Sequence, residues 1–116
     1  MNGDAVVFFD KAPELLPLYA ALEDAILARG PDAQVMVMKS QIAFTGARRF
    51  AFASLRGRRL IVTFGLPYRV ESPRIWQAVE PCPNRWTHHM ILRSKEEIDG
   101  TLLGWIEEAW NFASRK

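Results

Sequence analysis

The run Lys39-Ser40-Gln41 brings together three polar side chains that could bind an anion. A lysine neutralises negative charge, and the serine and glutamine side chains offer hydrogen bonds that orient a ligand. The run lies between two apolar stretches, where a bend or bulge would turn the side chains toward one shared pocket. A structural role fits equally well, because Ser40 and Gln41 could satisfy backbone groups at a bend while Lys39 remains solvated.

The adjacent pair His88-His89 is a second place where chemistry could occur. Neighbouring residues of a strand point to opposite faces, so the two imidazoles cannot ligate one metal ion. We expect one histidine to pack near Trp86 with a hydrogen bond and the other to face solvent or a pocket, where it could carry a proton. With two histidines and one cysteine in the chain, we expect no metal and no cofactor.

The single cysteine, Cys82, cannot form a disulfide within the chain. Nearby Arg85 could lower its pKa and make it nucleophilic. Its position in Pro81-Cys82-Pro83 instead favours a thiol in a rigid loop.

Basic charge is concentrated in the middle of the chain. Residues 39–93 hold ten Lys and Arg against Glu71 and Glu80, a net charge of +8, whereas the segments before and after are acidic, at −4 and −2. Arginines bind phosphate oxygens bidentately, and the interleaved aromatic residues Tyr68, Trp76 and Trp86 could stack on a base. Alternatively, the arginines could solubilise turns and pair with acidic helices. The residues we expect to bind an anion are Lys39, Ser40, Gln41, Arg49, Arg69, Arg85, Trp86, His88 and His89.

The length of 116 residues and the apolar content of 49% predict one domain, residues 1–116, with a single core. The N-terminus lacks a basic region followed by a long apolar run, and no apolar stretch approaches the roughly 18 residues that a spanning helix needs. These features predict a cytoplasmic protein without a membrane partner.

Two amphipathic segments predict helices. Residues 13–29 carry apolar side chains at three-and-four spacing, with prolines near the start and Gly30 at the end. Residues 95–113 show the same spacing, and Ser94 with Glu97 matches a capping box. A further turn or short helix is expected at residues 5–9.

Between these helices the apolar period changes to two, which is typical of strands. Gly57 lies in a short turn and can adopt the positive φ angle that a hairpin requires. The Pro-rich connection 66–85 is expected to hold only a short helix at residues 73–78. The strands are predicted at residues 34–38, 41–45, 49–55, 59–66 and 88–93.

No crossover helix separates the strands, so the order of elements predicts an α+β fold. We expect a two-layer domain with a mainly antiparallel sheet of four to five strands, covered on one face by the N- and C-terminal helices. The uncovered face and the long loop would then determine function.

The stretches Lys39-Ser40-Gln41-Ile42-Ala43-Phe44, Arg49-Phe50-Ala51 and Arg85-Trp86-Thr87-His88-His89 carry a resemblance. Over nearly its whole length the chain resembles a family of uncharacterised bacterial domains of unknown function. The resemblance implies a small α+β unit, and it implies no activity.

The sequence therefore leaves three functions open. The first is a non-catalytic module that binds an anionic ligand, either nucleic acid or a phosphorylated small molecule, through its basic sheet and loop. The second is a small enzyme that uses His88 or His89 with Lys39. The third is a protein-interaction or dimerisation domain, through which the protein could form a homodimer. A concave pocket would favour a small ligand, and a broad arginine surface would favour nucleic acid.

Overall fold

The computed structural model describes residues 3–30 and 32–114. Helices occupy both ends of the chain, with the strands between them. The helical elements are α1 (Gly3–Phe8), the 3-10 turns η1 (Phe9–Lys11) and η2 (Pro13–Leu15), α2 (Leu16–Arg29), a third 3-10 turn η3 (Lys95–Glu97) and α3 (Gly100–Ala113). The strands are β1 (Gln34–Val37), β2 (Ile42–Thr45), β3 (Arg49–Arg56), β4 (Arg59–Leu66), β5 (Gln77–Cys82) and β6 (Arg85–Leu92).

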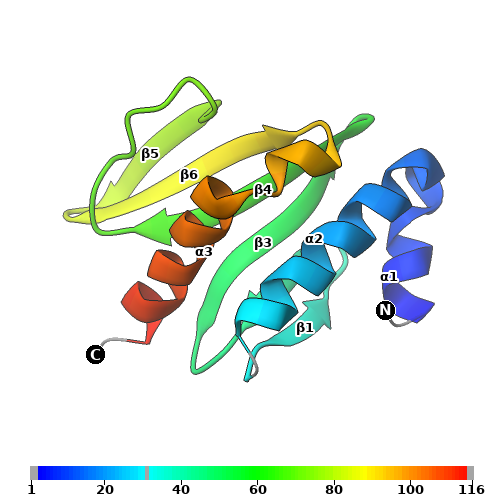
Figure 1. Cartoon of the computed structure of the whole chain (residues 1–116), viewed down its shortest axis with the longest axis horizontal. Helices are drawn as coiled ribbons and strands as arrows, with labels where there is room; N and C mark the ends of the chain where they lie inside the picture. Colours follow the sequence, from blue (N-terminus) through cyan, green and yellow to red (C-terminus); the bar gives the residue numbers. More distant parts are fainter. Residues whose placement is uncertain (1–2, 31, 115–116) are drawn as a thin grey trace.

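The strands form one antiparallel sheet of six strands in the order β1-β2-β3-β4-β6-β5. Figure 1 shows α2 and α3 lying over the same face of this sheet, with α1 beside α2 at the edge of the sheet. We call the face under α2 and α3 the covered face, and the opposite one the open face. The fold is therefore α+β with two layers, as the sequence predicts.

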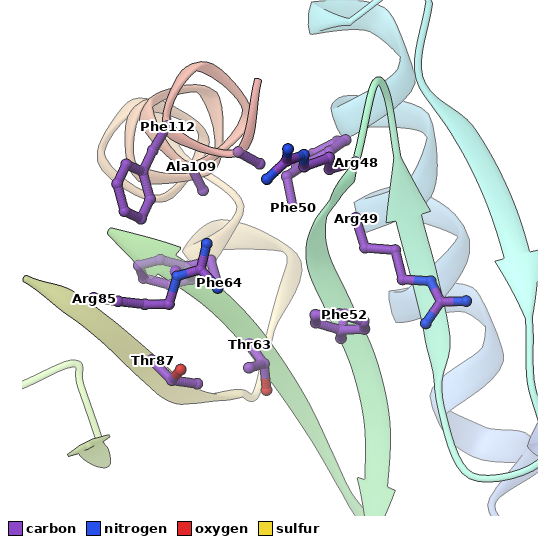
Figure 2. A pocket seen from close by; sticks show the side chains of 12 residues that line it. Arg48, Arg49, Phe50, Phe52, Thr63, Phe64, Arg85, Thr87, Ala109 and Phe112 are labelled. Carbon is purple, nitrogen blue, oxygen red and sulfur yellow. The ribbon is translucent and has the colours of Figure 1, made fainter. Parts of the chain in front are cut away.

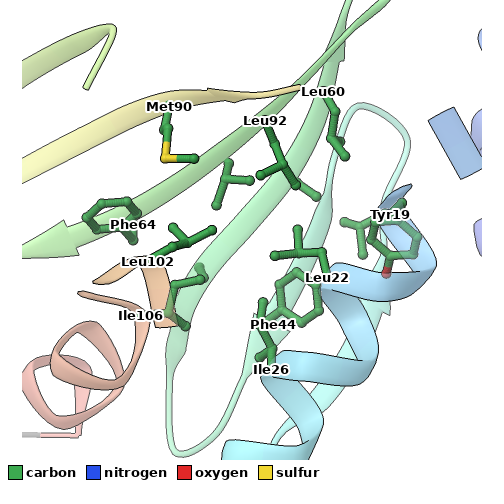
Figure 3. Close-up of a cluster of buried hydrophobic side chains, with 14 of the residues drawn as sticks. Tyr19, Leu22, Ile26, Phe44, Leu60, Phe64, Met90, Leu92, Leu102 and Ile106 are labelled. Atoms are coloured by element: carbon green, nitrogen blue, oxygen red, sulfur yellow. The ribbon is translucent and has the colours of Figure 1, made fainter. Parts of the chain in front are cut away.

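The hydrophobic core fills the space between the helices and the covered face (Figure 3). Alternate residues of each strand point into it because successive side chains of a strand point to opposite sides. The core includes Tyr19, Leu22 and Ile26 from α2, Leu102 and Ile106 from α3, and Phe44, Leu60, Phe64, Met90 and Leu92 from the sheet. Gly57, with a φ of 63°, makes the expected turn between β3 and β4.

The helix predicted at residues 73–78 is wrong. Residues 73–74 form a turn, and β5 begins at Gln77 as an edge strand paired with β6. Cys82 is the last residue of this strand rather than part of a loop, and its thiol is free and exposed. An edge strand tolerates Pro81, because a proline there removes no central hydrogen bond from the sheet.

The predicted helix 95–113 is divided in two. Glu97 accepts hydrogen bonds from the N–H groups of Arg93 and Ser94 at 2.6 and 3.3 Å, but the helical turn there is only η3. The longer α3 has its own N-cap, Asp99, whose carboxylate accepts from the N–H of Leu102 at 3.0 Å. Two capping residues thus replace the single one that the sequence predicts.

The connection 67–76 packs against α3. Tyr68 donates a hydrogen bond to Glu108 at 2.8 Å, and Arg74 contacts both carboxylate oxygens of Asp99 at 3.1 Å. Arg74 also donates to the carbonyl of Glu97 at 2.7 Å. These bonds fix the long connection and leave the open face without a helical cover. No helix within the described ranges is long and apolar enough to cross a membrane.

Candidate functional site

A row of side chains crosses the open face of the sheet from edge to edge. The strand registers pair each member with the next: Met36, Ala43, Phe52, Thr63, His89 and Gln77. Thr63 lies near the centre of the row, and its hydroxyl shares a hydrogen bond of 2.9 Å with Nδ1 of His89. A cavity opens on either side of this pair.

The first of them, the arginine cavity, has a volume of about 300 Å³ and an aromatic floor. It lies beside the C-terminal end of α3 (Figure 2), and its lining combines open-face residues such as Thr63 with residues that also belong to the core, such as Phe64. Gly65 contributes no side chain there, which helps to leave the space open. The cavity is lined by Arg48, Arg49, Phe50, Phe52, Thr63, Phe64, Gly65, Arg85, Thr87, Ala109, Phe112 and Ala113.

Two guanidinium groups are directed toward this space. Figure 2 shows Arg48 and Arg85 pointing toward the gap beside Phe112, whereas Arg49 extends the other way. The guanidinium of Arg49 lies 3.7 Å from the sulfur of Met36, and that of Arg85 lies over the Phe112 ring at 5.8 Å. Within residues 3–30 and 32–114, no carboxylate pairs with Arg48 or Arg85, and none lines the cavity.

Other arginines of the basic segment do have acidic partners. Arg58 pairs with Glu14 at 2.6 Å, and Arg74 with Asp99 at 3.1 Å. Arg69 lies 3.7 Å from Glu71 and stands over the Trp86 ring at 5.8 Å. Part of the +8 charge is therefore neutralised within the fold.

Trp110 fixes the turn that carries Arg48. Its ring stacks on Phe50 at 5.5 Å, and Phe50 is the extra residue of a bulge in β3. The ring also fills the space beside two glycines: a Cβ on Gly30 would come within 1.7 Å of it, and one on Gly46 within 2.9 Å. Only glycines permit this close approach, which joins the end of α2 and the β2–β3 turn to α3.

The second cavity, the glutamine cavity, has a volume of about 430 Å³ and a more polar lining. One wall is formed by Trp76, whose ring lies 5.1 Å from the guanidinium carbon of Arg56. Burial and, to a lesser degree, the charge of Arg56 lower the pKa of His89, so its imidazole is neutral at pH 7. The lining residues are Ser40, Gln41, Ser54, Leu55, Arg56, Ile61, Thr63, Trp76, Gln77 and His89.

Of the residues predicted to bind a ligand, five line these cavities: Ser40, Gln41, Arg49, Arg85 and His89. The other four do not. Lys39 is exposed in the β1–β2 turn, which the hydrogen bond from Met38 N–H to the Gln41 carbonyl closes at 2.8 Å. Arg69 and Trp86 contact each other and line neither cavity.

His88 belongs to the core instead. It is fully buried, stacks on Phe64 at 5.2 Å, and its Nε2 accepts the N–H of Val70 at 2.9 Å. Burial is the main cause of its lowered pKa. The two histidines therefore lie on opposite faces, as predicted from their adjacency, and only His89 reaches a cavity.

Thr63 was missed by the sequence reasoning, and Arg48 and Trp76 were not singled out from the other arginines and aromatic residues. In the sequence, Thr63 is one polar residue of a predicted strand with no feature that marks it. Only the pairing of β4 with β6 places it beside His89. Among the described residues there is no group of three or more His, Cys, Asp or Glu side chains that could hold a metal ion.

No curated protein and no solved structure matched the chain. A family model described as "Domain of unknown function (DUF5655)" matches residues 6–113. Because this match covers nearly the whole chain, the protein belongs to the DUF5655 family.

Proposed function

We propose that the protein is a non-catalytic module that binds a small anionic molecule in the arginine cavity, where Arg48 and Arg85 hold a phosphate or carboxylate group. One observation supports this proposal above the others. Two arginines without an acidic partner among the described residues converge on a concave space whose lining contains no carboxylate.

The aromatic floor makes this arrangement suited to anion binding. Phe52, Phe64 and Phe112 limit the access of water, and charge-assisted hydrogen bonds are stronger where the local dielectric is low. A guanidinium presents its donors in a planar fork that matches the oxygens of phosphate and carboxylate. An anion between the two arginines would also relieve the repulsion of their like charges.

The same geometry favours a small ligand over nucleic acid. A nucleic-acid surface needs many free basic side chains spread along a path for the phosphates. Here Arg58, Arg69 and Arg74 are close to carboxylates, and the arginines that remain at the cavity line a hollow. The enzyme alternative gains no support, because Lys39 does not line the cavity that holds His89.

Isothermal titration calorimetry with inorganic tripolyphosphate, pyrophosphate and citrate tests the proposal. Arg48→Ala and Arg85→Ala should each weaken the tightest of these interactions roughly 10- to 100-fold, the value of one or two charge-assisted hydrogen bonds. Binding should also weaken with added salt, because the charges are partly exposed.

Arg59→Ala is the matched control. It removes the same charge from the same segment, but Arg59 lies at the hairpin end of β4 and lines neither cavity. Its affinity should stay close to that of the unaltered protein. Equal losses of affinity in all three variants would mean that binding depends only on the net charge of the protein. Absence of binding at low salt would refute the proposal.

A further inference from the structure

We infer that the two cavities form one groove for a free nucleotide with at least two phosphates. The phosphates would lie between Arg48 and Arg85, and the base in the glutamine cavity. This inference rests on the proposed function and specifies its ligand. It begins from Thr63, which lines both cavities and so places them next to each other.

The length of the groove requires an extended ligand. Gly65 of β4 lines the arginine cavity and Ile61 of the same strand lines the glutamine cavity. Four residues of a strand at about 3.3 Å each separate these ends by about 13 Å. A single phosphate or carboxylate cannot fill both ends, whereas a ribose and a chain of phosphates can connect a base with a distant terminal phosphate.

The chemistry of the glutamine cavity suits a base. The amides of Gln41 and Gln77 each offer a donor and an acceptor, as the edge of a nucleobase requires. The Trp76 side chain is 44% exposed and provides a ring on which a base can stack. Arg56 lies 5.1 Å from that ring and helps to hold its orientation. Thr63 and His89, between the two ends, would face the ribose.

Other extended anions fit less well. A fatty acid would need a second cavity with an apolar lining, but this one contains hydroxyl, amide and imidazole groups. A neutral sugar would leave Arg48 and Arg85 without a counter-charge. A nucleotide provides negative charge at one end and a planar hydrogen-bonding ring at the other, in the order that the groove presents them.

Calorimetry on the full chain can test this with four probes: ATP without magnesium, tripolyphosphate, adenosine and a short single-stranded oligonucleotide. Trp76→Ala should weaken ATP binding about 5- to 150-fold, the range for loss of one base stack. Gln41→Ala should weaken it about 2- to 10-fold. Neither variant should change the affinity for tripolyphosphate, whereas Arg85→Ala should weaken both ATP and tripolyphosphate.

Val79→Ala is the control for Trp76→Ala. Val79 is also 44% exposed and lies on β5, but it lines neither cavity. It should leave ATP binding unchanged, and thermal melting of each variant verifies that it is folded.

The outcomes separate this inference from the proposed function. Suppose that tripolyphosphate binds through Arg85, that ATP binds no more tightly than tripolyphosphate, and that Trp76→Ala leaves the affinity for ATP unchanged. The anion site is then supported and the nucleotide inference is overturned. If no anion binds, both fail. If the oligonucleotide binds more tightly than ATP through the same residues, the ligand is a nucleic-acid strand, and the free nucleotide is again ruled out.

Discussion

His88 and His89 are neighbours on β6 but lie in different environments. His88 is fully buried on the covered face and stacks on a core phenylalanine, whereas His89 lines a cavity on the open face and shares its hydrogen bond with a threonine. The same residue type thus supports packing at one position and could contact a ligand at the next. The difference arises from the two-residue period of a strand and from the helices that cover only one face.

Charged residues differ between these regions in a similar way. Beside the covered face, Arg74 is held by Asp99 and by the carbonyl of Glu97, and it fastens the long connection to α3. Beside the C-terminal end of α3, Arg48 and Arg85 border a cavity whose described lining contains no carboxylate. The fold alone explains the paired Arg74, whereas Arg48 and Arg85 have no carboxylate partner among the described residues and motivate the proposed anion site.

The largest expected effect comes from comparing two phenylalanines on opposite faces. Phe44 is fully buried and packs against Tyr19, so Phe44→Ala should lower the free energy of unfolding by about 3–5 kcal/mol. Phe52 is only partly buried in the arginine cavity, and Phe52→Ala should cost about 1 kcal/mol. Urea denaturation measures both changes.

If Phe44→Ala does not fold, Phe44→Leu makes the same comparison with a smaller loss. Equal losses at Phe44 and Phe52 would mean that the open face is packed as a second core.

The next effect concerns the contact between the end of α2 and α3, where Trp110 meets Gly30. Gly30→Ala should destabilise the protein by about 1–3 kcal/mol, because the added Cβ would overlap the indole ring. Gly104→Ala is the control, since a Cβ there meets nothing within 4 Å and the residue lies inside α3. It should stabilise by about 0.5–1 kcal/mol through helix propensity, so thermal melting should shift in opposite directions.

The fold could be predicted from sequence wherever burial is periodic. Strands β3 and β4 alternate clearly and end in a turn with Gly57, so their hairpin was found. Strand β5 was missed because nearly all of its residues are exposed and it contains Pro81, so it carries no apolar period. The break before α3 was missed because Ser94 and Asp99 are both good N-caps and five residues apart.

The candidate site was partly predictable, for a related reason. Ser40 and Gln41 form a polar run between strands, and a place beside a pocket was one of the two roles considered for them; Lys39, expected in the same pocket, does not line it. The partners across the strands depend on register, which the sequence does not state, so Thr63 was not recognised. Sequence also cannot tell which arginines have acidic neighbours, and therefore Arg69 was favoured over Arg48.

A smaller effect distinguishes the two caps near α3. Asp99→Ala should destabilise by about 0.5–2 kcal/mol, because it removes the acceptor for Leu102 N–H and the partner of Arg74. Ser94→Ala should cost less, since only the single turn η3 follows it. A chemical denaturation midpoint that falls further for Ser94→Ala than for Asp99→Ala would show that the first turn governs this region.

The smallest effect is the dependence of stability on pH, which returns to the two histidines. The pKa of each is lowered in the folded protein, mainly by burial, while the unfolded chain keeps a value near 6.5. Between the folded and unfolded values the unfolded state binds more protons. Stability should therefore be fully present above about pH 6.5 and should decrease as the pH falls below it.

Replacing each histidine by glutamine, which stays neutral throughout, separates the two contributions. His88→Gln should remove the larger part of this decrease, because His88 is completely buried and its Nε2 must stay unprotonated to accept the Val70 N–H. His89→Gln should remove a smaller part, since His89 is only partly buried beside an open cavity. Denaturation midpoints measured from pH 5 to 8 give the slopes directly, and the comparison depends on slopes rather than on absolute stability. If His89→Gln removes more of the decrease than His88→Gln, protonation of His89 costs more than protonation of His88. The cavity histidine, rather than the core histidine, would then be the one whose surroundings most strongly oppose a positive charge.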